Sequence, residues 1–160
     1  MARVGCICGN VLSNSDCPSK DVIYIYSRKD VDVAILTNPS ITLWDFYSID
    51  SPYAYFYCHN CGRVYKFNIK GTGEWWIFGK ADSFEEQSLN SDWQEVYVFT
   101  DIEIDEITEE NFTIGLAEFL KNTYKPYRFW YNSRRQILQA YESDKHSFAF
   151  TYILEEKGRR

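Results

Sequence analysis

Two short cysteine motifs lie far apart in this chain, and together they limit how it can fold. The motifs GCICGN and CHNCGR contain Cys6, Cys8, Cys58 and Cys61, so the first pair is about fifty residues from the second. Thiolates in tight, glycine-containing turns are common ligands of Zn²⁺, which takes four of them in a tetrahedron. If both pairs bind one ion, the N-terminal segment must pack against the segment around residue 60.

The second motif is followed by a glycine, a basic residue and an alternating run, and it resembles a zinc-ribbon knuckle. The usual form is Cys-x-x-Cys-Gly on both sides, and the first motif, Cys6-x-Cys8-Gly9, is one residue shorter. The resemblance covers residues 5–10 and 57–70. It implies a structural zinc ion bound by Cys6, Cys8, Cys58 and Cys61, with no open position for water.

Other interpretations of the cysteines stay open at this stage. Cys17 can replace Cys6 or Cys8 as a ligand, or it is a spare thiol. The thiols can also form a redox pair or remain unligated and buried. A redox Cys-x-x-Cys normally begins a helix, whereas this one lies between predicted strands, which favours zinc. The ring of His59 is expected to point away from the metal.

The composition favours a β-sheet. Thirteen Tyr, eleven Phe and five Trp stand against one Met, and aromatic side chains suit a pleated surface. At 160 residues, without an internal repeat or low-complexity linker, the chain is predicted to form a single domain over 1–160. We predict an α+β fold: a mainly antiparallel β-sheet with two or three short helices and a zinc-ribbon-like pair of knuckles.

Alternating and aromatic runs predict eight strands. They span residues 22–27, 53–58, 65–70, 74–80, 94–100, 127–132, 136–142 and 147–155. A helix is predicted over 28–37 from the capping-box spacing of Ser27 and Asp30, although Val31, Val33 and Ile35 alternate as in a strand. A second helix is predicted from Thr108 to Lys121, with Phe112, Leu116, Phe119 and Leu120 as its buried stripe.

Neither a signal peptide nor a membrane-spanning apolar run is recognised, so a cytoplasmic protein is expected. No nucleophile–base set or phosphate-binding loop is present, and His146 lies in a polar turn, so an enzyme is not expected.

The net charge of −6 is unevenly distributed. Residues 81–120 contain twelve acids and no Lys or Arg, so the other 120 residues carry eleven acids and seventeen bases. Within TDIEIDEITEENF, acids alternate with isoleucines, a pattern that suits an interface with a basic protein. The candidate partner-binding residues are Asp101, Glu103, Ile104, Asp105, Glu106, Ile107, Glu109 and Glu110. The alternative is a solvated acidic loop and helix start.

A small, acidic, sheet-rich chain with the outline CICGN…CHNCGR and no catalytic set resembles the immunity proteins of bacterial toxin–immunity pairs. The resemblance implies a noncovalent inhibitor of a basic, nuclease-like toxin. The alternative is a zinc-ribbon module that binds nucleic acid or acts in transcription, with bases on a hairpin after the second knuckle and aromatics for stacking. Its candidates are Arg63, Lys66, Lys70, Tyr65, Trp75 and Trp76. The sequence pI of about 4.9 disfavours nucleic acid as the partner.

Overall fold

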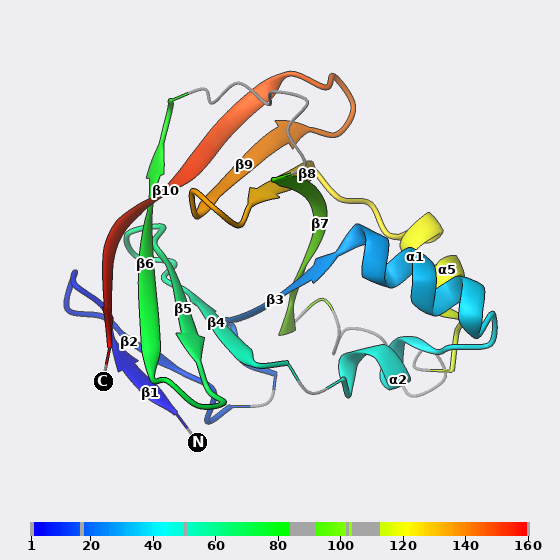
Figure 1. Ribbon diagram of the computed structural model, residues 1–160, viewed down its shortest axis with the longest axis horizontal. Coiled ribbons are helices and arrows are strands. Elements are labelled where there is room, and N and C mark those ends of the chain that lie inside the picture. The colour runs from blue at the N-terminus through cyan, green and yellow to red at the C-terminus, as the bar shows by residue number, and fades with distance from the viewer. Residues whose placement is uncertain are drawn as a thin grey trace.

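Two antiparallel meanders pair along both edges and close into an eight-stranded barrel in the computed structural model (Figure 1). The structure describes residues 2–16, 18–49, 51–83, 92–101, 103 and 113–159. The first meander consists of β3 (Val22–Ser27), β4 (Tyr53–Tyr57), β5 (Val64–Asn68) and β6 (Glu74–Ala81). The second consists of β7 (Trp93–Thr100), β8 (Tyr127–Asn132), β9 (Ile137–Glu142) and β10 (Phe148–Arg159). The pairs β3·β7 and β6·β10 join the two.

Strand β10 closes the barrel because it is long enough to pair with a strand of each meander. Its first half, up to Tyr152, pairs with β9, and the part from Thr151 to Arg159 pairs with β6. The register shifts between Leu154 and Glu156, where a bulge bends the strand. Closure leaves no free edge along most of the sheet.

Side chains alternate between the barrel interior and its outer face. The interior cluster contains Ile23, Val64, Trp76, Phe78, Val96, Leu138, Ala140, Phe150 and Tyr152. On the outer face of β4, β5 and β6, Phe56, Tyr65 and Ile77 contact a separate hairpin formed by β1 (Arg3–Gly5) and β2 (Val11–Ser13). This hairpin brings the first cysteine motif to the barrel wall.

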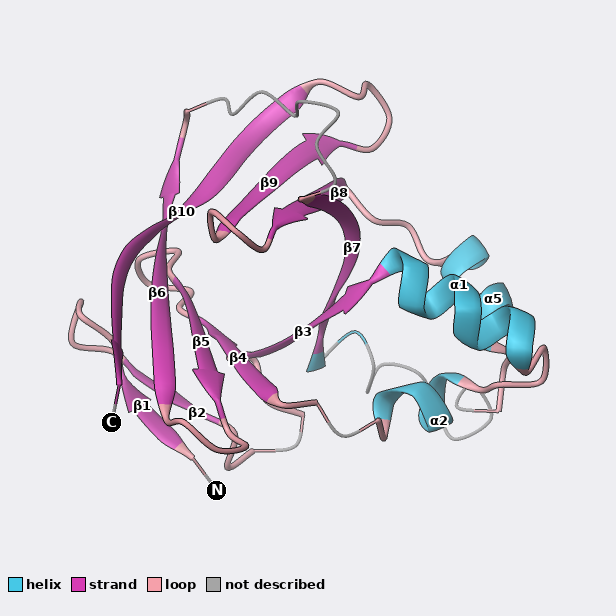
Figure 2. Cartoon of the chain, viewed as in Figure 1, coloured by secondary structure: helices cyan, strands magenta, loops and turns pink. Residues whose placement is uncertain are grey.

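The helices gather on one side of the barrel, beyond β3 and β7 (Figure 2). Those whose bounds lie within the described residues are α1 (Arg28–Thr37), α2 (Leu43–Tyr47) and α5 (Leu116–Asn122). Val31, Leu43, Phe46 and Leu116 are buried together, and Tyr26 and Tyr97 from the outer face of the sheet pack against them. No helix among the described residues is long and apolar enough to cross a membrane.

The predicted fold class is confirmed, and every predicted strand corresponds to an observed one. The helix at 28–37 is confirmed and the competing strand is wrong, but Ser27 caps it without a side-chain hydrogen bond. A capping box is formed instead at α2, which was not predicted, by Thr42 and Asp45. The second predicted helix, from Thr108 to Lys121, corresponds to α5, which begins only at Leu116. Thr108 itself lies outside the described residues.

Candidate metal centre

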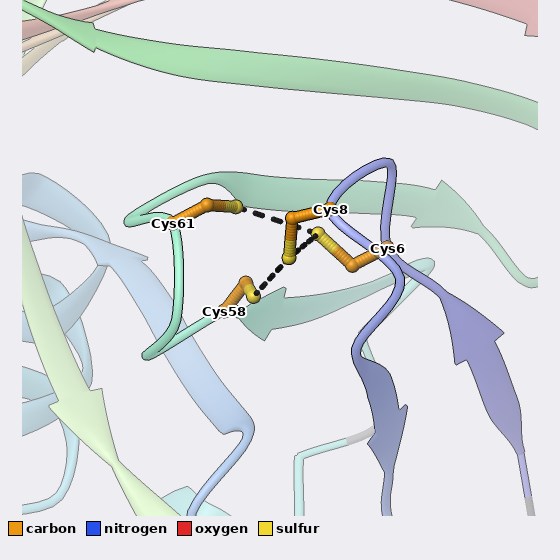
Figure 3. A group of neighbouring side chains, drawn as sticks. All are labelled: Cys6, Cys8, Cys58 and Cys61. Atoms are coloured by element: carbon orange, nitrogen blue, oxygen red, sulfur yellow. Dashed lines mark hydrogen bonds between the residues drawn. The ribbon is translucent and has the colours of Figure 1, made fainter.

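The four predicted ligands meet at one end of the hairpin β1–β2. Cys6 and Cys8 lie on the loop that joins β1 to β2, and Cys58 and Cys61 lie on the loop between β4 and β5 (Figure 3). The Sγ atoms of Cys6 and Cys8 are 3.3 Å apart, those of Cys6 and Cys61 3.4 Å, and those of Cys8 and Cys58 3.7 Å. All four sulfurs lie within 4.8 Å of one another. The four thiols therefore form a cluster that can bind a metal ion.

Each cysteine pair is held in a tight turn that requires a glycine. The Gly62 N–H donates to the Cys58 carbonyl at 2.7 Å, and the Gly9 N–H donates to the Cys6 carbonyl at 2.9 Å. Both glycines have a left-handed backbone, with φ of +70° and +88°, a region that other L residues rarely adopt. The shorter spacing of the first motif is thus compatible with a turn that presents both sulfurs.

The two loops also exchange hydrogen bonds around the sulfurs. The Asn60 side-chain amide donates to Cys8 Sγ at 3.3 Å, and the Asn10 side-chain amide lies 3.7 Å from Cys58 Sγ. The Asn60 amide, followed by the Asn10 backbone N–H, lowers the pKa of Cys8 to about 6. At Cys58, burial acts against the N–H groups of the loop, which together lower the pKa of that thiol.

The pKa of Cys6 is shifted upwards, in contrast to those of Cys8 and Cys58, because burial raises it to about 12. The cluster therefore contains thiols that ionise readily beside one that does not. Four thiolates at these separations repel one another, and a bound cation supplies the charge that lets all four ionise. The chemistry of the donor set accordingly fits a thiophilic metal cation.

Tyr65 links the first cysteine loop to the barrel. Its hydroxyl donates to Cys6 Sγ at 3.0 Å and accepts the N–H of Ile7 at 3.0 Å. On the other side of the cluster, Arg63 forms an ion pair with Glu155 of the β10 bulge at 2.6 Å. That pairing, together with the neighbouring Cys61, raises the pKa of Arg63.

In the sequence analysis, Tyr65 and Arg63 were candidates only of the alternative nucleic-acid module, and Asn10 and Asn60 were given no role. Their positions within or next to the two cysteine motifs were the available signal.

These features define the class of protein: an antiparallel β-barrel with a metal-binding tetracysteine cluster on its outer wall. The chain belongs to the family described as a domain of unknown function (DUF8617), whose model matches residues 2–89. The matched part contains all four cysteines of the cluster and strands β1 to β6. No curated protein and no solved structure matches the chain.

The structure brings together all four predicted ligands. His59 is not among the clustered groups, since its Nε2 lies 2.7 Å from the Lys20 carbonyl oxygen and its ring packs edge-on against Tyr57. Cys17 lies outside the described residues, and both residues that it was considered to replace, Cys6 and Cys8, belong to the cluster.

The prediction for the acidic surface needs correction at Asp101. This residue is 6% exposed, and its carboxylate accepts hydrogen bonds from the Ser19 N–H, Tyr24 and Tyr47. It is therefore an interior residue and not part of an exposed acidic face.

Glu103 is partly exposed, but it pairs with Lys125 at 2.7 Å and accepts the Thr100 N–H. The remaining candidates lie outside the described residues: Ile104, Asp105, Glu106, Ile107, Glu109 and Glu110.

Burial also removes three residues from the nucleic-acid hypothesis. Tyr65 is 2% exposed, Lys66 5% and Trp76 7%, so none of them can contact a phosphate or stack on a base. Arg63 is engaged by Glu155. Lys66 was a candidate base of this hypothesis on the hairpin after the second knuckle, but it projects into the barrel among Tyr53, Trp76 and Tyr131 and not towards solvent.

Proposed function

We propose that the tetracysteine cluster binds one structural Zn²⁺. Zinc–sulfur bonds of about 2.3 Å in a tetrahedron place the sulfurs about 3.8 Å apart. The observed separations of 3.3, 3.4 and 3.7 Å need only a small expansion to reach that value. Four protein ligands leave no coordination site for water or substrate, so the ion would supply a cross-link between the hairpin β1–β2 and the β4–β5 loop.

The hydroxyl of Tyr65 is expected to strengthen this site from outside the ligand set. Tyr65→Phe removes the hydrogen bond to Cys6 Sγ and the acceptor of the Ile7 N–H while it keeps the ring in place. We expect zinc affinity to fall roughly tenfold or more, as for other groups that orient metal ligands. Competition with a chromophoric chelator measures this change. Tyr124→Phe, at a tyrosine that is 76% exposed, is the control and should bind zinc as the natural protein does.

We propose further that the protein is a non-enzymatic immunity protein, which binds and neutralises a basic, nuclease-like toxin. The observation that supports this proposal most is the acidic segment that follows β7, residues 101–110. The segment has no Lys or Arg, and it is anchored to the barrel at its start. Asp101 anchors it through three hydrogen bonds, and Glu103 through Lys125 and the Thr100 N–H. A concentration of negative charge along the chain attracts a basic protein and speeds the encounter.

The far end of this segment is anchored as well. The Leu43 N–H donates to the Ile114 carbonyl at 3.3 Å, and the Leu116 N–H donates to the Ile41 carbonyl at 2.8 Å. The segment thus returns to the chain beside α2. The described residues on both sides of the acidic segment are therefore held by hydrogen bonds to the rest of the chain.

Reversal of two charges within the segment tests the partner proposal. Asp105→Lys together with Glu106→Lys is expected to slow association with the toxin at least several-fold at low salt, and less at high salt, because screening weakens steering. Ile104→Asp or Ile107→Asp is expected to act on dissociation or on stability instead. Surface plasmon resonance with the toxin encoded beside the gene separates the two rates, and the melting temperature reports folding.

The matched control places the same change of charge elsewhere. Asp144→Lys with Glu156→Lys alters the net charge equally at two exposed positions outside the acidic segment. If both double variants slow association equally, the segment has no special role. If the neighbouring gene product does not bind, or the chain captures only acidic proteins, the immunity function is wrong.

A further inference from the structure

The barrel wall opens beside β3. The ladder between β3 and β4 contains only the pairs Val22–Phe56 and Ile23–Tyr55. By the alternation of an antiparallel ladder, the next hydrogen-bonded pair would join Ile25 to Tyr53, but this pair is not formed in the described sheet. The Tyr53 N–H donates instead to Ser51 Oγ at 3.2 Å. The backbone of Ile25 is consequently left at the edge of an opening.

A cleft of about 350 Å³ occupies this opening. Tyrosines dominate its walls: Tyr24, Tyr26, Tyr47, Tyr53 and Tyr55. Two carboxylates, those of Asp16 and Asp101, also line it, whereas none of the described residues that line it is basic. Lys66 does not line the cleft, but its Nζ already lies 4.2 Å from the ring centroid of Tyr53. The other tyrosines and the two carboxylates make the cleft complementary to a positively charged group.

The carboxylate of Asp101 is held firmly within this cleft. Its Oδ2 accepts the Ser19 N–H at 2.6 Å, and its Oδ1 accepts the hydroxyls of Tyr24 and Tyr47 at 3.0 and 3.2 Å. These three groups all donate to the carboxylate. None of the described residues forms an ion pair with it. The carboxylate is therefore held in position, without a cationic partner among the described residues, before any ligand binds.

Exposed apolar side chains surround the mouth of the cleft. Ile49 is 51% exposed and Ile69 58%, and both line it. Trp44, 52% exposed, packs on Tyr47 with the ring centroids 5.9 Å apart. Apolar rims around a pocket that takes a single anchor side chain are typical of protein–protein hot spots, since they exclude water from the anchor.

From this combination we infer that the cleft receives an arginine side chain, carried by an extended segment of the basic partner protein. The inference rests on the proposed function, because it names where that partner is bound. The planar guanidinium stacks on tyrosine rings and donates several hydrogen bonds towards a carboxylate, which the compact ammonium of lysine does less well. The backbone of Ile25 offers hydrogen bonds to an extended chain, as in β-strand addition.

A short peptide tests the cleft without the toxin. The probe is a blocked five-residue peptide with one central arginine flanked by valines, and its partner peptide carries citrulline, which has the same shape without the charge. Addition of the arginine peptide is expected to shift the NMR signals of the Ile25 amide and the Trp44 indole in a saturable manner. The citrulline peptide is expected to bind at least roughly tenfold more weakly.

A positive charge introduced at the mouth of the cleft tests the same inference by mutation. Ile69→Lys places a cation at the mouth of the cleft and should weaken the arginine peptide roughly tenfold through like-charge repulsion. Val11→Lys is the matched control, because Val11 is also 58% exposed but does not line the cleft, and it should leave binding unchanged. The melting temperatures of both variants show whether the fold is kept.

The outcomes separate this inference from the proposed function. If the arginine peptide does not bind, if citrulline binds equally well, or if Ile69→Lys has no effect in a folded protein, the arginine cleft is wrong even when the toxin is neutralised. If the peptide binds as expected but no toxin is neutralised, the cleft stands as an arginine site and the immunity function fails.

Discussion

Cys58→Ser is expected to abolish zinc binding and to lower the free energy of unfolding by at least about 3 kcal/mol. Cys58 is fully buried among apolar residues that include Val4 and Leu12 of the hairpin β1–β2. The hairpin itself has three residue pairs, and an isolated hairpin of this size is marginal in water. Its attachment to the barrel is therefore expected to depend on the proposed metal ion as well as on these apolar contacts. Elemental analysis of protein purified without added zinc, together with urea unfolding, measures both effects.

Other substitutions near the cluster serve as controls. Cys17→Ser and His59→Ala should keep one zinc ion per chain, since His59 contacts the Lys20 carbonyl instead of the sulfurs. Full zinc content and full stability in Cys58→Ser would refute the site. Retention of zinc by Cys6→Ser alone would identify Cys17 as the fourth ligand.

Loss of the metal should loosen the N-terminal part first. The interior cluster of the barrel contains none of the described cysteines, and the strands of the barrel pair all the way round. Chelation is therefore expected to speed hydrogen exchange at amides of β1 and β2 well before those of β8 and β9. The proposed zinc ion would in this arrangement stabilise the attachment of the hairpin and not the barrel as a whole.

The sequence predicted the strands well because the signals for them are local. Runs rich in aromatic or β-branched side chains predicted β3 and β8 to the residue, at 22–27 and 127–132. The cysteine cluster was predictable for a similar reason, since the ligand types and the glycines of the turns are written into two short motifs.

Barrel closure could not be predicted in this way. It depends on pairing between strands distant in sequence, β3 with β7 and β6 with β10. The end of β10, Glu156 to Arg159, is polar and was not assigned to the last strand, which was predicted to stop at residue 155. These residues are strand because β6 pairs with them, and Gly158 leaves room for the indole of Trp75. Tertiary pairing here overrides local preference.

The same limit explains the errors at Lys66 and Asp101. Alternation divides a strand into two faces but does not say which face is enclosed, and a charged residue is ordinarily assigned to the outside. The ammonium of Lys66 and the carboxylate of Asp101 can both be buried because neighbouring groups interact with their charges. Aromatic rings surround the ammonium, and three hydrogen-bond donors surround the carboxylate.

The buried amine of Lys66 should give the protein an unusual dependence on pH. Its Nζ lies 4.2 Å from the ring centroid of Tyr53 and 4.6 Å from that of Trp76, and it donates to the Tyr131 hydroxyl at 3.3 Å. Burial lowers the pKa of Lys66 from 10.5 to about 8, against the smaller effect of Glu74. Between these values the unfolded chain holds a proton that the folded chain has lost. The contribution of Lys66 to stability therefore rises with pH in this window and is lost as the pH falls through about 8.

Lys66→Met isolates this effect, because methionine fits among the rings and carries no proton. The Tyr131 hydroxyl still donates to Gln136 Oε1 at 2.7 Å, so no buried acceptor is stranded. At pH 7 the variant should equal or exceed the natural protein in stability. The natural protein should then gain on the variant by about 3 kcal/mol as the pH rises towards 10.5. Urea unfolding of both proteins at each pH gives the difference, in which the titration of the tyrosines cancels.

An exposed lysine just beyond the same strand provides the comparison. Lys70→Met should change stability by less than about 0.5 kcal/mol at pH 7. If the difference in stability between the natural protein and Lys66→Met does not change between pH 7 and 10, the amine of Lys66 keeps its ordinary pKa in the folded protein, and solvent must reach it. A large loss of stability in Lys66→Met at pH 7 would instead show that the ammonium binds the rings strongly enough to outweigh its desolvation.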